Sequence, residues 1–125
     1  MRKPTRSQKK IDFPSKEKIK HNFNGLQAKI TFLCDVFLIE KIKNMLTSQH
    51  LASDYQYPNL SYFFRSALHA YQTGNLTLNY QRQNNPRKAI SFCLTEELFS
   101  FYNSLPIRSK AEILERILGS FCQLG

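Results

Sequence analysis

The chain has 125 residues and a formal net charge of +9, with 18 Lys and Arg against 9 Asp and Glu. This length suits one compact domain. The three cysteines include no C-x-x-C pair, which argues against a disulfide framework or a zinc ribbon and favours a reducing, cytoplasmic setting. No apolar run approaches the length of a membrane span, and none follows the basic N-terminus, so we expect neither a membrane partner nor a secretory signal.

The positive charge is concentrated in residues 1–27, which hold eight Lys or Arg against two acids, whereas residues 28–125 hold ten against seven. The eight cations are Arg2, Lys3, Arg6, Lys9, Lys10, Lys16, Lys18 and Lys20. With few large apolar residues around them, they predict a flexible basic N-terminal arm. Such an arm suits a polyanion, most often nucleic acid, and a solubilising tail is the alternative.

Beyond the arm, the same order of elements is predicted twice. Alternating and helical apolar periodicities predict a strand over residues 29–34 with helices over 36–49 and 59–74, then a strand over 89–94 with helices over 96–105 and 110–123. A strand-helix-helix segment of this size cannot close a core alone, so we expect the two segments to pair. The polar, Asn- and Gln-rich residues between them are expected to connect the two.

Capping residues mark the expected helix ends. Asp35, Asn59 and Thr95 precede three of the helices, Gly74 follows one, and residues 109–112 (SKAE) form the pattern of a capping box. Acidic residues lie near two helix starts, where the helix dipole explains them without acid–base chemistry. These acids are Glu96, Glu97, Glu112 and Glu115.

Each segment resembles a ribbon-helix-helix unit, of the family that includes the Arc, MetJ and CopG repressors. The likeness is carried by Ser109-Lys110-Ala111 at a helix start, by residues 67–74 (ALHAYQTG) at a helix end, and by the spacing of the elements. Two units in one chain resemble the tandem, TraY-type members, and the likeness covers about 85 residues. It implies a mainly α fold with a short two-stranded antiparallel ribbon, formed as an intramolecular pseudo-dimer. The implied domain is 28–125, with unit one at 28–74, a linker at 75–87 and unit two at 88–125.

The pairing decides which strand residues face outward. The ribbon must bury its apolar face against the helices, so only the alternate, outward side chains can contact DNA bases. These residues are Lys29, Thr31, Leu33, Ala89, Ser91 and Cys93. By resemblance, the second helix of each unit points its N-terminus at a phosphate. The phosphate contacts so assigned are Asn59, Leu60, Ser61, Ser109, Lys110 and Ala111, and the basic pair Arg87 and Lys88 is added to them.

The outward face departs from the family's pattern, because Lys29 is the one cation among the predicted base contacts and the second strand offers Ala, Ser and Cys. Two interpretations compete. In the first, Lys29 and Thr31 make the main contacts with an asymmetric DNA site, and the second strand contacts it by shape. In the second, the ribbon does not contact bases and the same fold binds another protein. The basic arm favours DNA, because it can supply phosphate or minor-groove contacts.

No catalytic or metal site is expected, because His21, His50 and His69 show neither H-E-x-x-H spacing nor a nearby Cys partner. The sequence therefore predicts a non-enzymatic, sequence-specific double-stranded DNA-binding protein without cofactor or small-molecule substrate. The family implies a transcriptional repressor or an accessory protein of a plasmid, virus or mobile element, cytoplasmic and nucleoid- or plasmid-associated. We expect a monomeric core that assembles cooperatively on DNA. The alternative is a protein-interaction module, an antitoxin or assembly adaptor, although little sequence follows the last helix to wrap a toxin.

Overall fold

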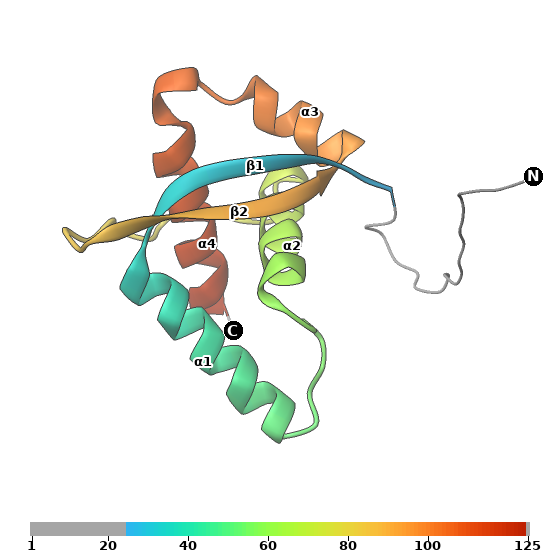
Figure 1. Cartoon of the computed structure of the whole chain (residues 1–125), viewed down its shortest axis with the longest axis vertical. Helices are drawn as coiled ribbons and strands as arrows, with labels where there is room; N and C mark the ends of the chain where they lie inside the picture. The colour runs from blue at the N-terminus through green and yellow to red at the C-terminus, as the bar shows by residue number, and fades with distance from the viewer. Residues whose placement is uncertain (1–24, 125) are drawn as a thin grey trace, which may run out of the picture.

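The computed structural model describes residues 25–124, which form four α-helices and a two-stranded antiparallel sheet (Figure 1). The elements in chain order are β1 (Leu26–Asp35), α1 (Val36–Leu51), α2 (Leu60–Gln72), β2 (Arg87–Thr95), α3 (Glu96–Ser104), the 3-10 turn η2 (Ile107–Ser109) and α4 (Lys110–Leu124). This confirms the predicted class, mainly α with a short antiparallel ribbon. The eight cations assigned to the basic arm lie outside the described residues.

The ribbon lies across α2 and α4, with α1 leaving one end of it and α3 the other (Figure 1). In the register, Ile30 is opposite Phe92 and Thr31 is opposite Ser91. Side chains alternate between the two faces of a strand, so the apolar pair faces the helices and the hydroxyl pair faces away. The register is therefore the one that burial predicts.

The core lies between the inner face of the ribbon and the helices. Its largest members include Phe32 and Phe92 from the strands and Phe63 and Phe64 from α2. The rings of Phe64 and Phe92 stack with centroids 4.3 Å apart and an interplanar angle of 10°. Leu114, Ile117 and Leu118 close the core from α4. Burial of these apolar side chains is the main force that holds the ribbon on the helices.

Three of the predicted caps are confirmed. Asp35 accepts hydrogen bonds from the amides of Phe37 and Leu38, Asn59 accepts one from Tyr62, and Thr95 accepts one from Leu98. Gly74 ends α2 at φ +80°, where its amide donates to Tyr71 and the next amide donates to Ala70. This pair of hydrogen bonds is the Schellman motif, in which glycine best tolerates the left-handed conformation.

Some predicted boundaries are wrong. β1 begins at Leu26, before the expected strand, and β2 begins at Arg87, the last residue that the sequence had assigned to the linker. The capping box at Ser109 is also wrong. The 3-10 turn η2 leads directly into α4, and the Ser109 amide donates to the carbonyl of Pro106. No helix within residues 25–124 combines the length and apolar character needed to cross a membrane.

Candidate functional site

The outer face of the ribbon carries the six side chains predicted to contact bases, and all six are exposed. They are Lys29, Thr31, Leu33, Ala89, Ser91 and Cys93. They form three cross-strand pairs, in which Lys29 is opposite Cys93, Thr31 opposite Ser91, and Leu33 opposite Ala89. The Thr31 and Ser91 hydroxyl oxygens lie 2.7 Å apart and share one hydrogen bond. The face therefore presents a cation at one end, hydroxyls in the middle and aliphatic groups at the other end.

A groove of about 480 Å³ borders the cationic end of this face. Residues of both strands and of α2 line it: Leu26, Lys29, Asn59, Ser61, Arg65, Ser91, Phe92 and Cys93. We call this end of the ribbon, where Leu26–Lys29 lie against residues 93–95, the α2 end. The groove brings together predicted base contacts and predicted phosphate contacts that are far apart in the sequence.

Arg65 is the groove residue that the sequence analysis missed. Its side chain is 8% exposed, and its Nη1 donates to the carbonyl of Cys93 at 3.1 Å. Burial lowers the pKa of its guanidinium, although an arginine remains charged under physiological conditions. The guanidinium is thus a fixed positive charge in the wall of the groove. The one feature of the sequence that could have indicated a role for Arg65 is its position next to the apolar residues Phe63 and Phe64.

The N-terminus of α2 contributes polar groups to the same groove. Asn59 is exposed, but its side-chain oxygen already accepts from the Tyr62 amide at 2.8 Å. Ser61 is half-buried and lines the groove directly, while Leu60 is half-buried and contacts the core. The positive end of the α2 dipole therefore adds to the charges of Lys29 and Arg65.

The other end of the ribbon, where Leu33–Asp35 pair with Arg87–Ala89, lies against α4, and we call it the α4 end. Here Ser109, Lys110 and Ala111 are half-buried. The ammonium group of Lys110 donates to the carbonyl of Leu105 at 2.7 Å and lies 5.1 Å from the centre of the Tyr102 ring. Lys110 is thus held toward α3, whereas Lys88 is exposed.

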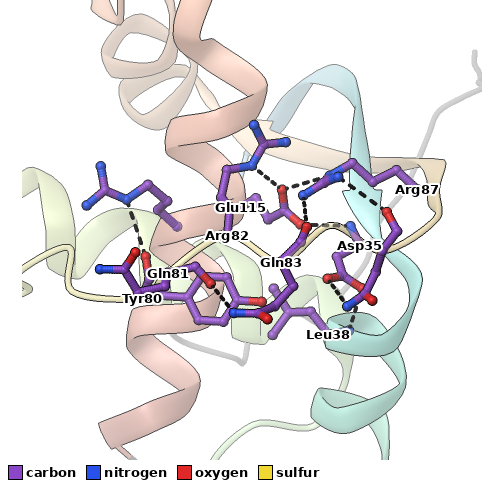
Figure 2. Close-up of polar contacts among 10 residues, drawn as sticks. Asp35, Leu38, Tyr80, Gln81, Arg82, Gln83, Arg87 and Glu115 are labelled. Carbon is purple, nitrogen blue, oxygen red and sulfur yellow. Dashed lines mark hydrogen bonds and ion pairs between the residues drawn. The ribbon is translucent and has the colours of Figure 1, made fainter.

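Beneath the α4 end lies a buried polar cluster centred on Glu115 (Figure 2). Its carboxylate accepts from Arg82 Nε at 2.6 Å, from Arg87 Nε at 3.1 Å and from the Asp35 amide at 3.0 Å. Glu115 is fully buried and paired with two arginines, so the helix-dipole role expected from the sequence does not account for it. Two cations and one amide neutralise and satisfy it, as a buried carboxylate requires.

Arg87, one of the predicted phosphate contacts, is largely engaged by this cluster. Besides Glu115, its guanidinium donates to the carbonyls of Asn85 and Gln83. The hydrogen bond to Glu115 raises the pKa of Arg87. Because a guanidinium has five N–H donors, two remain for an external partner. Lys88 is therefore the freer of the two basic residues.

The connection between α2 and β2 is docked on α4 through residues 78–82 (Figure 2). Ser120 Oγ accepts from the amides of Asn79 and Tyr80, and Arg116 donates to the carbonyls of Leu78 and Tyr80. Gly119 allows the approach, because a Cβ there would overlap the Tyr80 ring. We name residues 75–86 the strap. From its polar composition, the sequence had predicted only a connection between the two segments.

Cys34 and Asp35 lie at the edge of this cluster and are both fully buried. Burial, and then the negative charges of Glu115 and Asp35, raise the pKa of the Cys34 thiol from 9.0 to about 12. The Asp35 carboxylate is satisfied by two amides of α1 and by the Asn85 side chain. Cys34 is thus an inert neutral thiol, in contrast to the exposed Cys93.

Among residues 25–124, no group of three His, Cys, Asp or Glu side chains lies close enough to hold a metal ion. Comparisons with protein-family models, with curated proteins and with solved structures find no match to the chain.

Proposed function

We propose that the chain binds double-stranded DNA sequence-specifically, through the outer face of the ribbon inserted in the major groove. In this proposal it is a tandem ribbon-helix-helix protein whose two units form an intramolecular pseudo-dimer. It acts as a transcriptional repressor or as an accessory DNA-binding protein of a plasmid, virus or mobile element. The observation that carries the proposal is an exposed two-stranded ribbon bordered by a groove that contains Lys29 and Arg65.

The outer side chains suit the chemistry of base edges. A two-stranded ribbon fits the width of the major groove, where each base pair shows its own pattern of donors, acceptors and methyl groups. Lys29 can donate to the acceptors of a guanine, and the methyl groups of Thr31 and Ala89 can contact a thymine methyl. The hydroxyl pair of Thr31 and Ser91 keeps one O–H donor and several lone pairs for a base edge.

The function is tested by selecting duplexes from a random pool with the full chain and measuring affinity for selected and unselected DNA. We expect Lys29→Ala and Thr31→Ala to reduce discrimination by about 1–3 kcal/mol each, since they remove base contacts. Lys43→Ala, which removes an exposed lysine from α1, is the matched control and should leave discrimination unchanged. If Lys29→Ala and Thr31→Ala both retain full discrimination between selected and unselected DNA, the ribbon is not the source of specificity.

The arm has a separate role in this proposal. Deletion of residues 2–20 should weaken binding to all sequences alike and flatten its salt dependence, because fewer counterions are released. Sedimentation of the free protein at low micromolar concentration should show a monomer, since both strands of the ribbon belong to one chain. A change of sequence preference on deleting the arm would instead make the arm the specific element.

A second candidate is a protein-interaction module, such as an antitoxin or an assembly adaptor. It is favoured by two apolar side chains near the end of β1, where Leu33 is 56% exposed and Phe37 is 60% exposed. Failure of the full chain to select any duplex would favour this candidate over DNA binding.

A further inference from the structure

The two ends of the ribbon carry different side chains at three corresponding positions, although equivalent elements build the ends. Asp35 and Thr95 each cap the helix after a strand, and residues 59 and 109 each directly precede the second helix. Counted from these positions, Lys29 corresponds to Ala89, Ser61 to Ala111 and Arg65 to Glu115. In these three pairs the α2 end carries the two cations and the hydroxyl group, and the α4 end carries two alanines and an acid.

Arg65 and Glu115 show that this correspondence holds in space. Each is the sixth residue of its helix, and each makes a hydrogen bond to the ribbon backbone near the end of a strand. Arg65 donates to the carbonyl of Cys93 at 3.1 Å, whereas Glu115 accepts from the amide of Asp35 at 3.0 Å. The same structural position therefore holds a positive charge at one end and a negative charge at the other.

The cations near Glu115 do not make the α4 end equivalent to the α2 end. Arg82 and Arg87 bind its carboxylate, and the ammonium group of Lys110 is bound to the carbonyl of Leu105. Lys88 is the exposed cation there, but it is opposite the buried Cys34, so it belongs to the inward register and not to the outer face of Leu33 and Ala89. At the α2 end, Lys29 and Arg65 line one groove with the Ser61 side chain.

From this difference, and resting on the proposed function, we infer that the protein holds DNA asymmetrically, with a backbone phosphate bound in the groove at Ser61 and Arg65, beside the base contact of Lys29, and no corresponding phosphate clamp at the α4 end. The groove has the volume for a phosphate group and positive charge to attract it. The preferred DNA site is then not a palindrome. One half is anchored through its backbone, and the other half contacts Leu33 and Ala89 by shape and apolar groups.

The test compares two matched pairs of variants of the full chain, with a fluorescein-labelled duplex of mixed sequence as the probe. Ser61→Glu and Ala111→Glu place a carboxylate in the first turn of α2 and α4, where an acid favours the helix, so both variants should fold. Lys29→Ala removes the exposed lysine of the outer face at the α2 end, and Lys88→Ala removes the exposed lysine of the α4 end, which lies off the outer face. Thermal melting by circular dichroism on the same samples checks that each variant keeps its fold.

We expect Ser61→Glu to weaken binding roughly fivefold or more at low salt, because the new carboxylate faces a phosphate. Lys29→Ala removes a positive charge beside that phosphate as well as a base contact, so it should also reduce the slope of log affinity against log salt, by up to about 0.9. Ala111→Glu and Lys88→Ala should change affinity less than twofold and leave the slope as it is. In ethylation interference on a selected duplex, the sensitive phosphates should lie on one side of the site.

Equal losses in both pairs would overturn the asymmetry and leave DNA binding through the ribbon intact, as would greater losses at the α4 end. If all four variants bound like the wild type, the ribbon would not face DNA, and the proposed function itself would fail. A variant that melts at a lower temperature is replaced by its glutamine counterpart, Ser61→Gln or Ala111→Gln, for which the same ranking of the two ends is expected at smaller amplitude.

Discussion

Removal of the Glu115 side chain tests whether the buried cluster fastens the strap and the ribbon to α4. In Glu115→Ala the Asp35 amide remains buried and loses its acceptor, which costs about 1–3 kcal/mol. Arg82 and Arg87 keep contact with water, since their side chains are 32% and 22% exposed. Their lost ion pairs therefore add about 1 kcal/mol, far less than a fully buried pair would. We expect the free energy of unfolding to fall by about 2–4 kcal/mol.

Urea titration followed by far-ultraviolet circular dichroism at pH 7 measures this loss. Glu112→Ala is the matched control, because Glu112 is exposed on the same helix and its removal should cost no more than about 0.5 kcal/mol. Arg82→Ala should fall between the two, since it removes one ion pair but leaves the Asp35 amide bonded. A role of the Glu115 cluster in fastening the strap and the ribbon to α4 is excluded if Glu115→Ala is no more destabilising than Glu112→Ala, or if Arg82→Ala destabilises as much as Glu115→Ala.

Two further predictions concern buried groups near the same cluster. Because the pKa of Cys34 is raised from 9.0 to about 12, the unfolded thiol loses its proton first, and stability should fall by up to about 1.4 kcal/mol per pH unit between these values. Urea titrations should show a shallower decline in Cys34→Ala, and parallel declines would contradict the assignment. Gly119→Ala should destabilise by about 1–3 kcal/mol through overlap with the Tyr80 ring, despite the better helix propensity of alanine. In a Tyr80→Ala background the same change should stabilise, and a thermal double-mutant cycle that shows no coupling would exclude this contact.

The elements and the ribbon register could be predicted from the sequence because they depend on local patterns. Alternation over residues 29–34 and 89–94 predicts one apolar face for each strand, and a single register then buries both faces together. Asp35, Asn59 and Thr95 are caps whose hydrogen bonds reach only two or three residues along the chain. These three caps could be predicted because both partners of each hydrogen bond are close in the sequence, whereas the capping pattern at Ser109 was displaced by the 3-10 turn η2.

The strap and the two charged residues at the ribbon ends could not be predicted in the same way. In the sequence, Glu115 resembles an acid placed near a helix start. Its partners Arg82 and Arg87 are distant in the sequence and contact it only in the folded chain. Likewise, the strap is polar by composition, and its docking depends on Gly119 and Ser120 lying where its backbone passes. Their partners are set by tertiary packing, which a single-sequence pattern does not encode.

The presence of both strands in one chain explains how the ribbon ends can differ. In a symmetric dimer of identical chains, each residue occurs at both ends, so a buried acid at one end would be repeated at the other. Here Arg65 and Glu115 occupy corresponding positions without that restriction. The connection between the two halves also supplies Arg82, one of the cations that neutralise Glu115. The strap thus helps to neutralise a buried acid at the α4 end, whereas Lys29 and Arg65 contribute positive charge to the groove at the α2 end.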